Sequence, residues 1–169
     1  MDDAPSRPPV PARRILALWL PHLPTDRIAR QDRLLSSREG KGSADRAPLS
    51  PQPLAVVARV KSALRLVALN HAAERLGLAR GMALADARAM IPTLAVADAD
   101  DAADMALLDA VADWAERYTP LVALDETQPL AGHEHGLMLD ITGCAHLFGG
   151  EAALAGDLVM RLKRQGFAA

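Results

Sequence analysis

The chain has 169 residues, of which 50% are hydrophobic and 3% aromatic, and its formal net charge is −2. This length allows one medium domain or two small ones that share a boundary. The scarcity of aromatic residues argues against stacking platforms for single-stranded nucleic acid. The single cysteine, Cys144, excludes an internal disulfide and a thiolate zinc site, which fits a reducing cytoplasm.

The charges are distributed unevenly along the chain. Residues 98–157 contain thirteen acidic residues and one basic residue, whereas residues 52–97 contain six basic and two acidic residues. Since phosphate binding relies on clustered Lys and Arg, the acidic half is predicted to be a poor DNA surface. The simplest interpretation of the acidic run at 98–116 is a solvated helix face. No apolar run approaches the roughly 20 residues of a membrane span, so we expect a cytoplasmic location.

The first third of the chain predicts one strand and one helix. Residues 1–13 are expected to be a disordered N-terminus. The continuous apolar run at 15–20 has the length and character of a buried strand, and prolines follow it. A short helix is expected over residues 25–35. The Ser-, Gly- and Pro-rich residues 36–53 predict a flexible loop.

The middle of the chain predicts a hairpin followed by two short helices. Residues 54–60 and 63–69 are predicted strands joined by a Lys61-Ser62 turn. Asn70 is a favourable N-cap for a helix that runs to about residue 76. A second short helix is expected over residues 84–90.

The last third predicts two helices around two strands. Residues 101–118 form the clearest helical pattern, and strands are expected at 121–124 and 136–141, with a final amphipathic helix at 151–164. Helical spacing predicts that one stripe of the first helix is buried, made of Leu107, Val111, Trp114 and Tyr118.

Several motifs in this order resemble the N-terminal half of Y-family translesion DNA polymerases. The segment 53–56, Pro-Leu-Ala-Val, is similar to the P-V-A-V strand of that family. The segment 77–83, Gly-Leu-Ala-Arg-Gly-Met-Ala, is similar to its fingers motif G-V-R-S-G-M-P. Residues 118–122 and 139–143 are similar to Y-T-P-x-V and L-D-V-T-G. Two segments, 17–24 (Ala-Leu-Trp-Leu-Pro-His-Leu-Pro) and 142–149 (Thr-Gly-Cys-Ala-His-Leu-Phe-Gly), resemble the ImuB type within this family in particular. Members of the ImuB type are non-catalytic.

The resemblance implies an α/β fold with a ferredoxin-like palm and a small inserted fingers subdomain. The palm would consist of residues 14–35 and 94–169, and the fingers-like subdomain of residues 54–93. This is the palm and fingers portion alone, so the chain is expected to correspond to the N-terminal part of such a polymerase. An unrelated α/β domain with chance matches is the competing interpretation.

The resemblance also implies that the first carboxylates of the polymerase site are missing. Family members bind two Mg²⁺ ions through D-x-D at the end of the first strand and a D-E pair in a later hairpin. Aligned on the start of the first strand, the D-x-D carboxylates fall on Trp19 and Pro21. Asp26 is the nearest carboxylate, and it is expected on the following helix. Trp19 is interpreted as a plug of the former cleft or as a contact residue for a partner, with the plug favoured.

The second pair has two possible positions, depending on where the count starts. Counted back from residues 139–140, the D-E pair falls on His135 and Gly136. Counted forward from residues 119–120, it falls on 128–129, a Gln-Pro pair. Asp125 and Glu126 are a weaker alternative, since a lengthened hairpin could keep Asp125 at the end of its strand.

The nucleotide contacts of the fingers are degenerate in the same comparison. The family's Tyr and Arg that touch the incoming phosphates match His71 and Glu74. A carboxylate in place of a cation opposes phosphate binding, so we expect no nucleotide site. No catalytic residue, metal site or cofactor is expected. His133 and His135 beside Glu134 are interpreted as part of a solvated loop rather than as metal ligands.

The resemblance implies a scaffold or accessory factor in DNA-damage-induced translesion synthesis and DNA repair. The expected partners are those of the translesion mutasome: an ImuA protein, an error-prone replicative-type polymerase and the sliding clamp. DNA binding by this chain is expected to be weak or absent. Two alternatives stay open. One is an active template-directed nucleotidyltransferase that uses Asp125, Glu126 and Asp140, and the other is a truncated remnant with no independent role.

Overall fold

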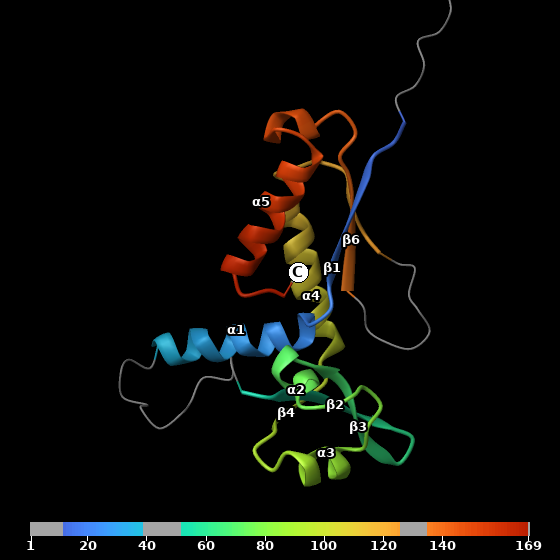
Figure 1. The fold of residues 1–169 in the computed structure, drawn as a ribbon, viewed down its shortest axis with the longest axis vertical. Coiled ribbons are helices and arrows are strands. Elements are labelled where there is room, and N and C mark those ends of the chain that lie inside the picture. The colour runs from blue at the N-terminus through green and yellow to red at the C-terminus, as the bar shows by residue number, and fades with distance from the viewer. Residues whose placement is uncertain (1–11, 39–51, 126–134, 169) are drawn as a thin grey trace, which may run out of the picture.

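The structure is a computed structural model that describes residues 12–38, 52–125 and 135–168. Figure 1 shows a sheet with two helices beside it at one end of the molecule and a second sheet at the other end. Helix α1 lies between these two parts, and α4 runs from one to the other. In chain order the elements are β1 (Ile15–Leu20), α1 (Leu23–Arg38), β2 (Leu54–Val60), β3 (Ala63–Leu69), α2 (His71–Arg75), α3 (Leu84–Met90), β4 (Ala95–Asp98), α4 (Asp101–Ala115), β5 (Val122–Leu124), β6 (His135–Asp140), the 3₁₀ helix η2 (Ala145–Phe148) and α5 (Glu151–Arg164).

The palm-like part is an antiparallel sheet in the order β1-β6-β5. Alternate residues of its strands face the helices α4 and α5 and form the main core. The side chains of that core are nearly all apolar and almost inaccessible to solvent, including Leu18, Leu20, Leu137, Leu139, Leu154, Leu158 and Leu162. An Arg14–Glu151 ion pair of 2.6 Å joins the start of β1 to the start of α5. One face of the sheet is therefore filled and the other faces away from the helices.

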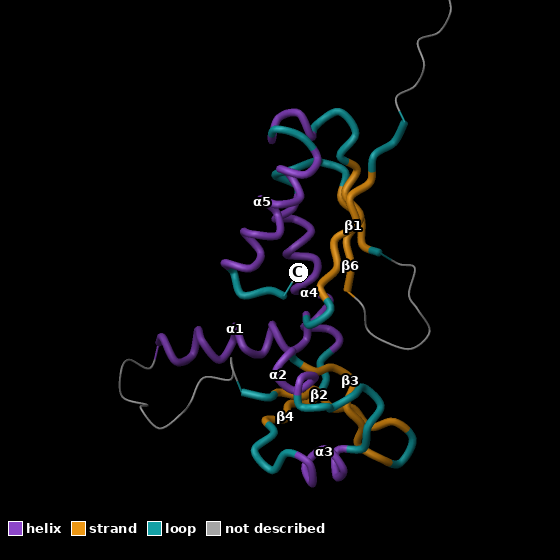
Figure 2. The backbone as a smooth tube through the Cα atoms, viewed as in Figure 1, coloured by secondary structure: helices purple, strands orange, loops and turns teal. Residues whose placement is uncertain are grey.

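The fingers-like part is a second sheet in the order β3-β2-β4 (Figure 2). The hairpin of β2 and β3 turns at Lys61, whose φ is 56°, and β4 pairs with β2 in parallel. The expected palm segment 94–169 includes β4, but in the structure this strand belongs to the fingers-like sheet. Its four residues carry no alternating pattern, so the pairing with β2 is what makes them a strand.

Most expected elements are present, and the differences have local causes. The two strands of the hairpin, α3 and α5 have the predicted bounds, and Asn70 caps α2 by accepting a hydrogen bond from the Ala73 backbone N–H. Helix α1 is longer than expected, because Pro24 lies in its first turn, where no backbone donor is required. Residues 36–38, expected in a loop, continue this helix, and 39–51 lie outside the described residues.

The buried stripe of α4 is rotated by about one residue from the predicted one. Leu108, Val111, Ala115 and Tyr118 are buried, whereas Leu107 and Trp114 are only partly covered. Adjacent apolar residues on a helix point roughly 100° apart, so the sequence could not decide between them. Asp104 corrects the view of the acidic run as a solvated face. It is 3% exposed and pairs with Arg27 of α1 at 2.5 Å.

Within the described residues, no helix has both the length and the apolar character that crossing a membrane requires.

Candidate functional site

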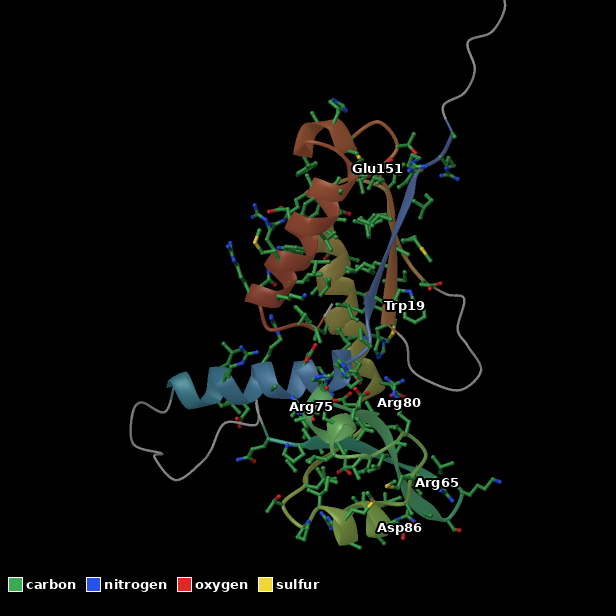
Figure 3. The ribbon with its side chains drawn as sticks, in the orientation of Figure 1. Trp19, Arg65, Arg75, Arg80, Asp86 and Glu151 are labelled. Carbon is green, nitrogen blue, oxygen red and sulfur yellow. The ribbon has the colours of Figure 1, made fainter. Side chains whose placement is uncertain are left out.

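The face of the palm-like sheet that no described helix covers holds the positions at which the sequence comparison expects polymerase carboxylates. We call it the open face and define it by Ile15, Ala17, Trp19, Ala123 and Met138, which point away from α4 and α5 because their neighbours in the strands point into the core. Trp19 is 48% exposed and Ile15 is 51% exposed. Figure 3 shows Trp19 near the end of β1, on the side of the sheet away from α5.

Trp19, Gly136 and Asp125 form one row across the three strands. Trp19 is the register partner of Gly136, and the Asp125 backbone N–H donates to the Gly136 carbonyl oxygen at 2.9 Å. Strands in a sheet are about 4.8 Å apart, so Trp19 and Asp125 flank Gly136 with their Cα atoms about 10 Å apart. Asp125 thus lies at the end of β5, level with Trp19, and Trp19 occupies the opposite side of the row.

Gly136 fits this row because it has no side chain. A Cβ at this position would lie 3.2 Å from the Asp125 Cβ and 3.3 Å from the Leu18 carbonyl oxygen. Both distances are shorter than ordinary van der Waals contact, and one neighbour is backbone that cannot turn aside. A glutamate at this position would require Asp125 or the end of β1 to shift by a few tenths of an ångström. His135, the preceding residue, points to the core face and is 8% exposed.

Asp140 lies at the other end of the same sheet. Its register partner is Ile15, four residues along β1 from Trp19, which separates it from the Asp125 row by about 14 Å at about 3.4 Å per residue. Its carboxylate accepts from the Thr142 backbone N–H at 3.0 Å and from the Arg13 guanidinium at 3.1 Å. The hydrogen bonds from Thr142, then the Arg13 charge, hold the pKa of Asp140 below its usual range.

Asp26 and Pro21, the two remaining residues that the sequence comparison singled out, make contacts away from this row. Asp26 lies in the first turn of α1 and accepts a 2.8 Å hydrogen bond from the Ala168 backbone N–H. Burial raises the pKa of Asp26 above its usual range. The Pro21 carbonyl oxygen accepts from the Arg80 guanidinium at 2.9 Å, so this turn is tied to the fingers-like part. Figure 3 shows Arg80 at the boundary of the two parts.

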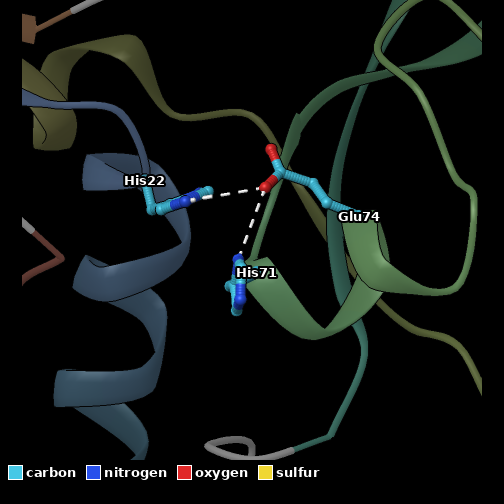
Figure 4. Close-up of side chains that lie close together, drawn as sticks. All are labelled: His22, His71 and Glu74. Carbon is cyan, nitrogen blue, oxygen red and sulfur yellow. Dashed lines mark ion pairs between the residues drawn. The ribbon is translucent and has the colours of Figure 1, made fainter.

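The degenerate fingers positions meet a residue that the sequence analysis did not single out. His71 and Glu74 lie on α2, and the His22 side chain approaches them from the turn between β1 and α1 (Figure 4). We call these three residues the junction cluster. His22 Nε2 lies 3.7 Å from Glu74 Oε2, and His71 Nδ1 lies 4.0 Å from the same oxygen. His22 and His71 are 49 residues apart in the chain, so no local sequence pattern predicts that they meet.

The remaining candidate residues at 126–134, among them Glu126, His133 and Glu134, lie outside the described residues.

Comparisons with known proteins bear on the family and the fold of the chain. The family model described as impB/mucB/samB matches residues 40–167. Protein ImuB from two strains of Caulobacter vibrioides is 50% identical over 91 residues, which cover 54% of this chain and 18% of the ImuB chain. The match thus spans less than a fifth of the length of these relatives.

Solved structures of Y-family polymerases share the fold. DinB from Sulfolobus solfataricus matches with a TM-score of 0.62 at 14% identity, over 91% of this chain and 39% of that chain. A post-insertion binary complex of Dbh DNA polymerase matches with a TM-score of 0.67 at 12% identity, over 91% of this chain and 40% of that chain. The expected α/β palm fold is confirmed. Since the family model covers most of its residues, the chain belongs to the impB/mucB/samB family, as an ImuB-like homologue of the N-terminal portion of Y-family polymerases.

Proposed function

We propose that this chain is a non-catalytic, Y-family polymerase-like accessory factor in DNA-damage-induced translesion synthesis and DNA repair. The observation that carries the proposal is the row of Trp19, Gly136 and Asp125. Phosphoryl transfer by two metal ions requires carboxylates that clamp both ions from more than one strand. Among the described residues, this row offers one carboxylate, opposite a tryptophan.

The fingers-like part supports the same proposal. A triphosphate needs positive charge and hydrogen-bond donors around it, yet Glu74 brings a carboxylate to the matching position, within 3.7 Å of His22. Two basic side chains of this part, Arg65 and Arg80, donate to backbone carbonyl oxygens of Gly81 and Pro21. These contacts direct both guanidinium groups toward the protein itself, and we propose weak or no DNA binding by this chain.

The open face is the surface we assign to protein partners. Its exposed side chains are apolar, and Trp is enriched among the residues that contribute most to protein–protein binding. The proposed partners are those of the ImuB family: an ImuA protein, an error-prone replicative-type polymerase and the sliding clamp.

Primer extension tests the non-catalytic part of the proposal. With a primed template and all four nucleotides, we expect no incorporation above the protein-free baseline with Mg²⁺ or Mn²⁺. The Asp125→Ala variant is the matched control, because it removes the carboxylate of the row. Incorporation by the unaltered chain that Asp125→Ala abolishes would contradict the proposal.

An active nucleotidyltransferase is the second candidate, and the position of Asp125 at the end of β5 is the observation in its favour. Against it stands the separation of about 14 Å along the sheet between the Asp125 row and Asp140, too far for two residues that must share a metal pair about 3.5–4 Å apart. In the same assay, this candidate requires that Asp125→Ala and Asp140→Asn both remove incorporation.

A further inference from the structure

Three potential metal ligands from two distant segments meet in the junction cluster. His22 directly precedes α1, whereas His71 and Glu74 lie one turn apart on α2. Their ligand atoms all lie within 4.8 Å of one another, and the described part of the chain contains no second group of this kind. Figure 4 shows the Glu74 carboxylate facing both imidazole rings.

The spacing is close to that of a bound transition ion. Glu74 Oε2 lies 3.7 Å from His22 Nε2 and 4.0 Å from His71 Nδ1. Ligands of a tetrahedral zinc ion, each about 2.0–2.1 Å from the metal, are about 3.3 Å apart. The side chains of His71 and Glu74 are 74% and 40% exposed, so small rotations in solvent can close the difference.

The ring of His22 is already oriented for metal binding. Its Nδ1 lies 2.8 Å from the Leu69 carbonyl oxygen, which can only accept, so Nδ1 carries the proton. In the neutral imidazole this leaves the lone pair on Nε2, the nitrogen that faces Glu74. Histidines that bind a metal through one nitrogen commonly donate the other N–H to a carbonyl or carboxylate, which fixes the ring.

The two ligands on α2 are held by a well-anchored backbone. The Asn70 side chain accepts from the backbone N–H groups of Ala73 and Leu54 at 2.9 and 3.1 Å and donates to the Gln52 carbonyl at 2.7 Å. These bonds fix the first turn of α2 against β2. Residues three apart on a helix share one face, so His71 and Glu74 are presented together.

We propose that His22, His71 and Glu74 bind a divalent transition ion of the Zn²⁺ type, which links the fingers-like part to the turn between β1 and α1. Two imidazoles and one carboxylate suit Zn²⁺, Co²⁺ or Ni²⁺, whereas Mg²⁺ and Ca²⁺ prefer oxygen ligands alone. The ion would add a further link to the hydrogen bonds that cross this boundary among the described residues, from His22 to Leu69 and from Arg80 to Pro21.

Calorimetric titration of the full 169-residue chain with Zn²⁺, after removal of metal by a chelator, tests the proposal. We expect one site per chain, at least about tenfold weaker in His71→Ala and in Glu74→Gln. His146→Ala is the matched control, since His146 is exposed on η2 and lies outside the cluster, and it should bind as the unaltered chain does. Co²⁺ should give visible absorption bands that the same two variants lose, and Mg²⁺ should not compete.

The readouts separate loss of ligands from loss of fold. Metal-free melting temperatures should be equal in the unaltered chain, His71→Ala and Glu74→Gln, because both side chains are exposed, and Zn²⁺ should raise the melting temperature of the unaltered chain alone. Absence of Zn²⁺ binding would overturn the proposal. So would binding that persists in His71→Ala and disappears in His133→Ala, which would place the ion in the 133–135 segment.

Discussion

The open face and the junction cluster differ in the kind of side chain they present. By resemblance, both correspond to places where Y-family polymerases handle metal and nucleotide. On the open face, Trp19 and Gly136 stand where carboxylates are expected, and the large exposed side chains, Ile15 and Trp19, are apolar. At the junction cluster, His71 and Glu74 stand where phosphate contacts are expected, and they gather with His22 into a polar group.

Under the proposed non-catalytic function, these two neighbouring regions are suited to different ligands. Covering exposed apolar side chains with another protein lowers the free energy by roughly 25 cal/mol per Å² of apolar area removed from water. Imidazole and carboxylate groups are instead stabilised by binding a cation, because burial against an apolar partner would remove their hydration without replacing it. This contrast is why we propose a protein partner for the open face and an ion for the cluster.

The largest expected effect distinguishes the two faces of β1. Leu18 is 5% exposed in the main core and its neighbour Trp19 is 48% exposed on the open face. We expect Leu18→Ala to lower the free energy of unfolding by about 2–5 kcal/mol, and Trp19→Ala by about 1–2 kcal/mol, less than the roughly 3–5 kcal/mol of a buried tryptophan. Chemical denaturation of both variants measures the difference. A loss from Trp19→Ala as large as that from Leu18→Ala would show that Trp19 plugs the former cleft.

Partner capture extends the same comparison to function. Trp19→Ala should weaken pull-down of ImuA or of the partner polymerase, whereas Leu147→Ala should not, since Leu147 is 71% exposed on η2, away from the open face. Equal capture by both variants would remove the open face from the proposed interface.

The helix layer behind the sheet provides a reporter that should not respond to changes on the open face. Tyr118 is the only tyrosine, and its hydroxyl donates to Asp157 at 2.7 Å. Burial, followed by the hydrogen bond to Asp157, raises the pKa of Tyr118 to about 12. The folded pKa exceeds the ordinary value of 10.0, so this contribution to stability is complete below that value and is lost as the pH rises toward 12.

Ultraviolet titration of tyrosinate measures this shift directly. We expect a single transition near 12 in the unaltered chain and in Trp19→Ala, and a lower one in Asp157→Asn, where the hydroxyl faces a neutral amide. A transition near 10 in Trp19→Ala would mean that the open face and the helix layer are coupled.

Local signals predicted those parts of the fold that depend on local contacts. Asn70 caps α2 as predicted. Its side-chain oxygen accepts from the backbone N–H of Ala73, only three residues further along the chain, so the contact is local. The strand at 95–98 was missed, because its pairing partner β2 lies about forty residues earlier in the chain. The burial of Asp104 depends in the same way on Arg27 of another helix.

The candidate site shows the same division. Motif spacing predicted Trp19 and Pro21 at the first carboxylate positions and either residues 128–129 or His135 and Gly136 at the second. The structure pairs Trp19 with Gly136 across adjacent strands, and the replacement of ligands stays a prediction. The spacing gives Asp125 only as the weaker alternative, because the hairpin is longer than in the family, and the structure places Asp125 in their row. The spacing gave no sign of His22, because a contact across 49 residues leaves no periodic trace in the sequence.

The smallest expected effect concerns Asp26, which lies between the two regions on α1. Burial raises the pKa of Asp26, and the hydrogen bond from the Ala168 backbone N–H and the charges of His22, Arg30 and Arg33 only partly offset it. A carboxyl whose folded pKa lies above its unfolded value binds its proton more tightly in the folded state. The ionised form therefore lowers stability above the folded pKa, and this cost is relieved as the pH falls toward the ordinary value of 3.8.

An asparagine at position 26 can still accept from the Ala168 backbone N–H but carries no charge. We expect Asp26→Asn to leave the free energy of unfolding at neutral pH within about 1 kcal/mol of the unaltered chain, on the stabilised side, and to remove this part of the pH dependence. Asp26→Ala, which leaves the Ala168 N–H without its acceptor, should be less stable than Asp26→Asn by about 1 kcal/mol. Denaturant titrations at neutral and at mildly acidic pH measure both differences. A clear loss of stability in Asp26→Asn at neutral pH would mean that the carboxylate is favoured by its arginine neighbours, and that α1 is held at the boundary of the two regions by charge.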